Sequence, residues 1–553
     1  MNHRNAPTSS AGCGDQLWLL VFVAVSLAVF WPSRHAGFVV DWLGWQMRYE
    51  AGGWADVPGS FGYRALQPVL QFCNYLMFRV FGTEGLPWYL LFASMHGVNG
   101  WLLYRLVRRL LQNEDIANPA LAAGFLFLLS PYAAETVVWR VCLHYLLSCA
   151  FMLGALHAAL DYFETAARRV LWRVQGLFVL GLFSLEWSLV VPILLGWLLM
   201  VYTLSHRRNT LRLRRRLTGL LLPPVAILGA YFALNKWLFG NWVGHYGAST
   251  HLNVDPQLLF STMLKYFAKY AGFVRYYEHP LKVKVFGWFD KPEVVWGSAA
   301  VLGLLMIWWF WRAFSKNANP RWQWAGFGLG AFFIALLPVA NLFFYYLQWS
   351  ENDRYGYFAA AFFWMTMVLA LSALPRRLFS FITTVLLVIS GYLLFKMNRI
   401  WGESEKIYAS LVQDFRWYDR DEVIILASPD NFKGVWIMRI IGQNNGFNEA
   451  LTLRRRAPYQ GDMWEVAQFN METPNDGVKV EKLETDSTGL TYKTMFPQFG
   501  NWWFRNGIGA SDYETTSYLF RTKEWHVETT LRERRPNRAI IYPVGGKWLE
   551  APQ

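Results

Sequence analysis

The sequence predicts a polytopic α-helical membrane protein with a small mixed α/β domain at its C-terminal end. Three observations support this fold class. Apolar runs fill residues 16–396, basic residues follow every second run, and residues 400–553 are more polar and charged. Of the 553 residues, 54% are hydrophobic and only 16% are charged, whereas about a quarter are charged in soluble proteins. The 30 Trp residues also favour a membrane, because Trp and Tyr gather at its two interfaces.

The number of membrane-spanning helices follows from the apolar runs. A helix needs roughly 20 apolar residues to cross the bilayer core, and about eleven runs meet or approach that length. The first, Leu17 to Trp31, lacks a small-residue cleavage site, so we expect a retained helix rather than a signal peptide. The predicted spans are 16–32, 88–107, 119–137, 140–160, 172–186, 188–204, 216–238, 295–313, 322–346, 355–374 and 378–396.

The orientation follows from the loops. Every second loop is short and basic, as expected for cytoplasmic loops. These loops contain Arg105, Arg108 and Arg109, then Arg168, Arg169 and Arg173, then Arg207 to Arg216, then Arg312, Lys316 and Arg321, then Arg376 and Arg377. We therefore expect a cytoplasmic N-terminus in a membrane domain of residues 1–399. Loops 33–87 and 239–294 and a domain of residues 400–553 are expected on the extracytoplasmic side.

Charge and cysteine content exclude several classes of function. The formal net charge is +14, but many basic residues lie in the loops that set topology, and no nucleic-acid-binding motif is present. We therefore expect no nucleic acid partner. The four cysteines have no CxxC or Cys/His spacing, so neither a disulfide framework nor a zinc site is expected. The sequence supports no metal and no other cofactor.

The loop at 239–294 contains a segment that mixes apolar and basic residues. Residues 257–278 place Lys265, Lys269 and Arg275 among Leu, Phe and Tyr, as in a helix that lies in the membrane interface. One interpretation is an amphipathic cap over the helical bundle. The other is a basic rim that helps to hold a lipid phosphate.

The C-terminal segment alternates strand-like and helical patterns. Residues 422–427 predict a buried strand, followed by a turn at 428–431 and a helix from Val435 to Ile441. Residues 490–495 and 539–542 also predict strands. We therefore expect a small mixed α/β domain.

Four acidic positions lie in or beside the predicted spans, where a charge is costly and needs a reason. They are Asp41, Glu135, Glu186 and the 351–354 group, all at extracytoplasmic helix ends. Asp41 has apolar neighbours that predict partial burial, which would raise its pKa and suit a general base. The alternative is a helix cap or a salt bridge. Arg64 follows in the same loop, where it could bind a phosphate oxygen or pair with an acid.

The other acids allow similar alternatives. Glu135 could cap a helix, where the dipole favours an acid, or contact a substrate, with Arg140 and His144 downstream. Glu186 lies in a turn between two apolar runs. Glu351, Asp353 and Arg354 occupy a turn between two spans, where the default interpretation is a solvated turn and the functional one is an Arg that meets a lipid phosphate.

Taken in order, these segments resemble the GT-C superfamily of integral-membrane glycosyltransferases. They are most similar to bacterial relatives of the transmembrane and tetratricopeptide-repeat O-mannosyltransferases, without the repeats. The matching motifs are Phe38 to Asp41, Tyr63 to Leu66, His96 to Asn99, Ser130 to Val137, Ser184 to Glu186, Asn341 to Phe344, and Asp353 to Tyr357. The motifs depart from the family at Trp42, which replaces a second acid, and at Ser130, Ala133 and Leu185, which replace two His and a Lys.

The resemblance implies the inverting transfer of a sugar from a polyprenyl-phosphate donor to an acceptor hydroxyl. Asp41 would be the general base, and Arg64 and Arg354 would hold the donor phosphate. The implied acceptor is an envelope glycan, a lipid or a protein. The residues expected to bind substrate are Glu135, Arg140, His144, Glu186, Asp353 and Tyr355.

Two further functions compete with this one. A transporter or flippase for a lipid-linked saccharide would want charges at mid-membrane depth and inverted repeats, whereas here the charges gather at one face. A scaffold that only anchors the outer domain would not need convergent acids. We expect a multi-pass protein of the bacterial inner membrane, surrounded by membrane lipids, with its C-terminal domain in the periplasm.

Overall fold

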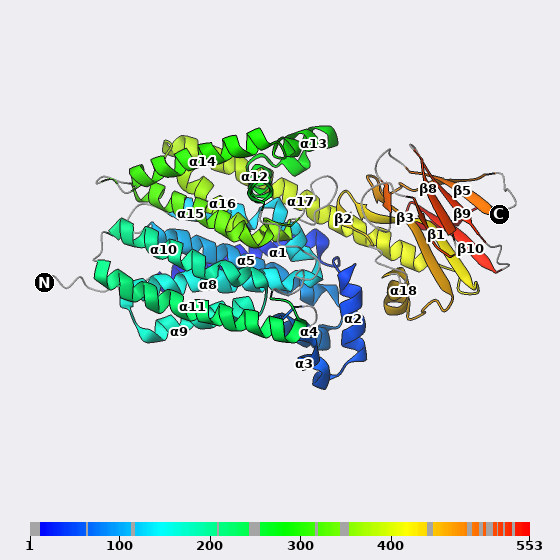
Figure 1. The fold of residues 1–553 in the computed structure, drawn as a ribbon, viewed down its shortest axis with the longest axis horizontal. Helices are drawn as coiled ribbons and strands as arrows, with labels where there is room; N and C mark the ends of the chain where they lie inside the picture. The colour runs from blue at the N-terminus through cyan, green and yellow to red at the C-terminus, as the bar shows by residue number, and fades with distance from the viewer. Residues whose placement is uncertain are drawn as a thin grey trace.

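The computed structural model contains a bundle of long helices and a C-terminal sheet domain, which lie end to end (Figure 1). It describes residues 11–61, 65–111, 117–206, 210–242, 255–313, 315, 319–342, 353–438, 446–483, 489–496, 502–504, 512–516, 518–523, 526–532 and 537–552.

Each of the eleven predicted spans contains a helix, as the fold class requires. The bundle helices are α1 (Ala11–Phe30), α5 (Gly85–Leu110), α6 (Ala117–Leu128), α7 (Ala134–Val138), α8 (Leu143–Thr165), α9 (Arg168–Leu182), α10 (Val191–His206), α11 (Thr210–Phe239), α14 (Pro292–Ala313), α15 (Pro320–Leu336), α16 (Tyr357–Leu371) and α17 (Arg376–Asp414). Shorter helices at the end near the sheet domain are α2 (Asp41–Ala51), α3 (Val57–Ser60), α4 (Pro68–Phe81), α12 (Pro256–Gly272) and α13 (His279–Trp288).

The described residues contain fewer clear membrane spans than the sequence predicted. Eight helices are long and apolar enough to cross a membrane, and α6 with α7, bent by 45°, makes up to nine. The two predicted spans that fall outside this set are α5 and α9. Helix α9 has only 15 residues. Helix α5 packs against α1, α6 and α8 and buries His96 and Asn99, so it faces protein and tolerates polar residues.

Helix α17 connects the bundle to the sheet domain. It has 39 residues and is therefore roughly 58 Å long at 1.5 Å per residue. The domain boundary predicted near residue 399 lies inside this continuous helix. Its last turns bury Tyr408, Leu411 and Val412. Leu411 also accepts a hydrogen bond at its backbone oxygen from Nε1 of Trp548 at 2.9 Å, so the helix anchors the sheet.

The sheet domain contains two sheets. The first has the strand order β11-β10-β1-β3-β6, with β2 paired to β1, and the second has the order β4-β5-β9-β8-β7. Strand β1 is parallel to β10 and to β3. The strands are β1 (Glu422–Phe432), β2 (Val435–Trp436), β3 (Asp462–Met471), β4 (Lys479–Lys482), β5 (Leu490–Met495), β6 (Trp502–Phe504), β7 (Tyr513–Glu514), β8 (Tyr518–Thr522), β9 (His526–Leu531), β10 (Arg538–Val544) and β11 (Lys547–Glu550).

Strand β1 is buried on both faces, which explains its continuous apolar run. Ile424 and Leu426 pack toward the second sheet, whereas Val423 and Ile425 belong to the core that continues to α17. The predicted strands at 422–427, 490–495 and 539–542 are confirmed as β1, β5 and β10.

Two local predictions for the C-terminal segment are wrong. The predicted turn at 428–431 continues strand β1, because β3 pairs with it through Phe432. The predicted helix at 435–441 begins instead with strand β2, in which Val435 pairs with Phe432 and Trp436 with Asn431 as a tight hairpin. Residues 439–441 lie outside the described residues.

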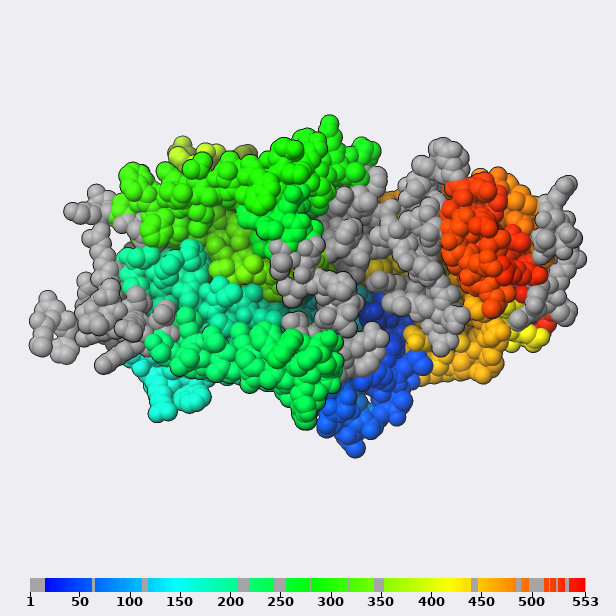
Figure 2. Space-filling model, in the orientation of Figure 1, coloured from blue at the N-terminus to red at the C-terminus, as the bar shows by residue number. Residues whose placement is uncertain are grey.

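The N-terminal loop region contacts both parts of the molecule. In the space-filling view, the blue atoms of α2 to α4 lie where the helical bundle meets the sheet domain (Figure 2). Helix α2 contacts α18 (Gly446–Ala450), and Glu50 of α2 accepts a hydrogen bond from Arg456 at 2.7 Å. The segment that contains Asp41 is therefore in contact with the sheet domain.

Candidate active site

A buried ion pair joins two of the predicted site residues. Glu135, on α7, is fully buried, and its Oε1 accepts a hydrogen bond from Nη1 of Arg354 at 2.7 Å. Its Oε2 accepts one from the backbone N–H of Arg354 at 2.9 Å. Arg354 begins a 3₁₀ turn, Arg354–Gly356. The Glu135 carboxylate therefore holds both the backbone of this turn and the guanidinium of Arg354.

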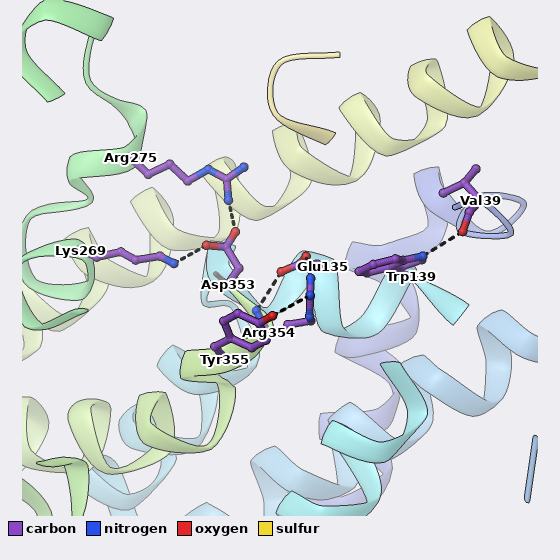
Figure 3. A network of polar contacts seen from close by, with 8 residues as sticks. All are labelled: Val39, Glu135, Trp139, Lys269, Arg275, Asp353, Arg354 and Tyr355. Atoms are coloured by element: carbon purple, nitrogen blue, oxygen red, sulfur yellow. Dashed lines mark hydrogen bonds and ion pairs between the residues drawn. The ribbon is translucent and has the colours of Figure 1, made fainter. Parts of the chain in front are cut away.

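The neighbouring Asp353 binds two cations from the 239–294 loop. Lys269, on α12, donates to Oδ1 at 2.5 Å, and Arg275 donates to Oδ2 (Figure 3). Asp353 is 1% exposed. Burial lowers the pKa of Lys269 and the charge of Arg275 lowers it further, whereas the charge of Glu135 raises it.

These contacts decide between the two interpretations of residues 257–278. Lys265 donates to Asp290 at 2.5 Å, while Lys269 and Arg275 donate to Asp353. Lys265 and Lys269 are buried on α12. The basic-rim interpretation is therefore wrong for these three side chains, which point at carboxylates and fasten the helix to the bundle as a cap.

Aromatic rings surround Arg354 and connect it to other predicted residues. The guanidinium lies 4.9 Å from the ring centroid of Trp139 and 4.5 Å from that of Tyr355, and Nη2 donates to the Tyr355 hydroxyl at 3.0 Å. Tyr355 packs edge-on against Trp187, with 5.4 Å between ring centroids. The planar guanidinium is thus held in one orientation.

The same aromatic chain reaches His144 and Glu186. Trp187 contacts Tyr145, whose ring lies 4.3 Å from that of His144. Glu186 directly precedes Trp187 at the start of a 3₁₀ turn, and its Oε1 accepts a hydrogen bond from the Tyr231 hydroxyl at 3.3 Å. Both residues therefore adjoin this row of rings, which ends at Arg354.

Arg140 is enclosed rather than open to a substrate. It is 1% exposed, and its Nη1 donates to the backbone oxygen of Val137 at 3.1 Å. Within the described part of the chain, its Nε and Nη2 have no hydrogen-bond partner. The rings of Phe38 and Phe92 lie 5.9 and 5.3 Å from the guanidinium. The predicted role of Arg140 as a substrate contact therefore does not fit its enclosed position.

Asp41 stands at the first position of α2, after a closely packed segment. A Cβ on Gly37 would lie 1.9 Å from the backbone oxygen of Val138, and Gly37 has φ +101°. Val39 accepts a hydrogen bond at its backbone oxygen from Nε1 of Trp139 at 3.1 Å (Figure 3). The segment before Asp41 therefore lies directly against the Trp139 that stacks on Arg354.

The backbone beside Asp41 is strained. Val40 has φ 58° and ψ −116°, a conformation that β-branched residues rarely adopt. Such strain costs on the order of 1–3 kcal/mol and persists only where the surroundings enforce it, which is common at active sites. The predicted partial burial of Asp41 is wrong, because α2 buries Trp42 and Leu43 and leaves Asp41 exposed.

Two predicted positions cannot be placed. Arg64 and Glu351 lie outside the described residues. Among the described residues, no group of three His, Cys, Asp or Glu side chains could hold a metal ion. Cys73, Cys142 and Cys149 form no disulfide.

The structure brings together two of the sequence motifs and adds Trp139, which the sequence did not single out. Nδ1 of His96 lies 2.6 Å from the Tyr357 hydroxyl, which accepts a hydrogen bond from Nδ2 of Asn99 at 3.3 Å. Two of the quoted motifs thus meet inside the bundle. Trp139 was missed because one Trp among 30 carries no distinguishing pattern, although it directly follows the apolar end of the Glu135 motif.

No protein-family model and no curated protein sequence matches the chain. Among solved structures, the fold is similar to the Archaeoglobus fulgidus oligosaccharyltransferase in complex with zinc and sulfate, with a TM-score of 0.36 and 13% identity. That match covers 65% of this chain and 51% of the oligosaccharyltransferase, about half of its length.

The fold is also similar to ArnT from Cupriavidus metallidurans in two states. The apo structure matches with a TM-score of 0.32 and 14% identity, over 81% of this chain and 90% of ArnT. The structure bound to undecaprenyl phosphate matches with a TM-score of 0.31 and 15% identity, over 83% and 90%. The chain is a polytopic helical membrane protein with a C-terminal sheet domain, and its fold is similar to those of this oligosaccharyltransferase and of ArnT.

Proposed function

We propose that this protein transfers a sugar, with inversion, from a polyprenyl-phosphate donor to an acceptor hydroxyl at the end of the bundle near the sheet domain. One observation carries the proposal. An exposed carboxylate, Asp41, follows a strained Val40, and the segment before it is bonded to Trp139, whose ring packs on Arg354 of the buried Glu135–Arg354 pair. A carboxylate that can reach solvent next to fixed positive charge suits a base that works beside a phosphate leaving group.

The reaction that we propose has one displacement step. Asp41 accepts the proton of the acceptor hydroxyl, and the oxygen attacks the anomeric carbon of the donor sugar. The bond between that carbon and the phosphate oxygen breaks, and its electron pair leaves with the lipid phosphate. A positioned general base contributes about 10²–10⁴-fold to the rate of such a step.

The leaving phosphate needs positive charge that does not have to reorganise. The guanidinium of Arg354 is held in one orientation by Glu135 and by the rings of Trp139 and Tyr355. We assign the phosphate contact to Arg354 and, by motif position, to Arg64.

The remaining predicted residues receive supporting roles in this proposal. Glu135 and Asp353 hold the Arg354 turn in place. Glu186, His144 and Tyr355 lie along the aromatic chain beside that turn, where they would contact the sugar or the acceptor. We propose that the acceptor is an envelope glycan, a lipid or a protein.

The proposed location follows from the basic loops. Because basic loops stay in the cytoplasm, the site and the sheet domain would lie on the extracytoplasmic side of a bacterial inner membrane. Polyprenyl-phosphate donors and membrane lipids would then reach the site from the outer leaflet.

The test is label transfer in proteoliposomes. The purified protein would be supplied with a panel of labelled polyprenyl-phosphate sugars and an envelope-glycan extract. Label that moves into the extract supports a transferase. Label that crosses the bilayer while it stays on its lipid carrier would instead support a transporter. No movement of label from any donor would contradict the proposal.

A further inference from the structure

Three consecutive carbonyl groups shortly before Asp41 are held by donors from two distant parts of the chain. The backbone oxygen of Gly37 accepts a hydrogen bond from the backbone N–H of Arg140 at 3.1 Å. That of Val39 accepts one from Nε1 of Trp139 at 3.1 Å. That of Phe38 accepts one from Nη2 of Arg454 at 3.1 Å. The first two donors belong to the helical bundle, whereas Arg454 belongs to the sheet domain.

The guanidinium of Arg454 is held in the orientation that it needs to bind the backbone oxygen of Phe38. Its Nη1 donates to Oε1 of Glu405 on α17 at 2.7 Å, and its guanidinium lies 4.1 Å from the ring centroid of Tyr408. Its side chain is 24% exposed. A guanidinium that binds a carboxylate with one nitrogen and stacks on a ring can present its other nitrogen in one direction.

The local structure that presents Arg454 is unusual. Residues Leu451–Arg455 form a π-helical turn, a rare feature that is frequent at functional sites. The side chains of the three consecutive arginines, Arg454 to Arg456, point from this turn toward different partners. Arg455 donates to the backbone oxygens of Val412 and Gln413 near the end of α17, and Arg456 donates to Glu50. Only Arg454 reaches the segment before Asp41.

We propose that Arg454 is a positioning residue for Asp41, so that the sheet domain completes the active site. Strain at Val40 persists only while the neighbouring backbone is held, and the Arg454 bond to Phe38 supplies a direct restraint on that backbone from the sheet domain. The inference rests on the proposed function, in which Asp41 is the base. It assigns the sheet domain a direct part in the rate of transfer.

The three arginines supply matched variants for the experiment. Arg454→Gln removes the bond to Phe38, Arg455→Gln removes bonds to α17, and Arg456→Gln removes the pair with Glu50. Each would be measured for label transfer at saturating donor and acceptor, for the donor KM, and for amide hydrogen exchange in a peptide that covers residues 37–43.

The expected result separates Arg454 from its neighbours. Arg454→Gln should lower kcat by about 10–100-fold, the range for a misplaced catalytic group, with little change in the donor KM and with faster exchange in residues 37–43. Arg455→Gln and Arg456→Gln should leave kcat and that exchange close to wild type.

Two results would overturn the proposal. One is wild-type kcat and exchange in Arg454→Gln, and the other is an equal loss of kcat in Arg455→Gln, which would point to domain docking instead. If the wild type transfers no label from any donor, the proposed function fails. The exchange comparison then still decides whether Arg454 holds this segment.

Discussion

Replacing Glu135 with Gln should destabilise the protein strongly, because it breaks a buried ion pair. Oε1 of Glu135 lies 2.7 Å from Nη1 of Arg354, and side-chain exposures are 0% and 9%. At an effective dielectric constant of about 20, opposite charges at this distance attract by about 6 kcal/mol. Desolvation offsets part of this, and removal of one partner of a buried pair costs about 3–5 kcal/mol.

The substitution also affects the turn. Gln keeps one carbonyl oxygen and gains an NH₂ group, so one of the two donors on Arg354, Nη1 or the backbone N–H, must face another donor. We therefore expect Glu135→Gln to lower the unfolding free energy by about 3 kcal/mol and to weaken the binding of a polyprenyl-phosphate donor.

Two controls define the expected effect. Glu422→Gln breaks a buried pair with Arg538 in the sheet domain, so it should destabilise without changing donor binding. Glu403→Gln breaks an exposed pair with Lys406 and should cost about 0.3–0.5 kcal/mol. Unfolding would be followed by detergent titration in mixed micelles. If Glu135→Gln behaves like Glu403→Gln, the account of a buried, charged pair is refuted.

Two further predictions concern other residues. Gly37→Ala should abolish transfer and destabilise the protein, because its Cβ would lie 1.9 Å from the backbone oxygen of Val138. Gly44→Ala is the control and should be tolerated, because a Cβ at Gly44 meets nothing within 4 Å. Transfer and unfolding assays on both variants test this, and an active Gly37→Ala would contradict the close packing at Gly37. Burial, with the charge of Arg275, lowers the pKa of Lys282 from 10.5 to about 8. The charge on this partly buried lysine therefore destabilises the folded state fully below about pH 8, and this effect fades toward about pH 10.5. Lys282→Met should thus raise the unfolding midpoint at pH 7 and lose that advantage by pH 10. Lys406→Met, at an exposed lysine, should show no such change. An equal gain for Lys282→Met at both pH values would contradict the lowered pKa of Lys282.

The helical part of the fold could be predicted because length and apolar character alone decide where helices cross a membrane. The end of α17 was missed, although its signal is present. Met397, Trp401, Tyr408 and Leu411 recur at helical spacing and are buried, which would have extended the helix toward Asp414. The strand at 428–431 was missed because Pro, Asp and Asn favour turns locally. Here Asn431 bonds to Asn470 on β3, and tertiary pairing overrides the local preference.

The candidate site could be predicted as a set of residues but not as a set of contacts. Acids at helix ends stand out because charges there are costly. Glu135 and Arg354, however, are 219 residues apart in the chain, and nothing local relates them. The same holds for Arg454 and Phe38, which are 416 residues apart. The exposure of Asp41 depends on which face of α2 packs, and apolar neighbours in sequence do not reveal that.

The most direct test of the central claim compares Asp41→Asn with the wild type in single-turnover transfer from a saturating polyprenyl-phosphate sugar. Asn has nearly the same shape but cannot accept the proton. If Asp41 is the base, Asp41→Asn loses at least about 10²-fold in the rate, with donor binding unchanged. Transfer by Asp41→Asn at the wild-type rate would contradict the assignment of Asp41 as the base.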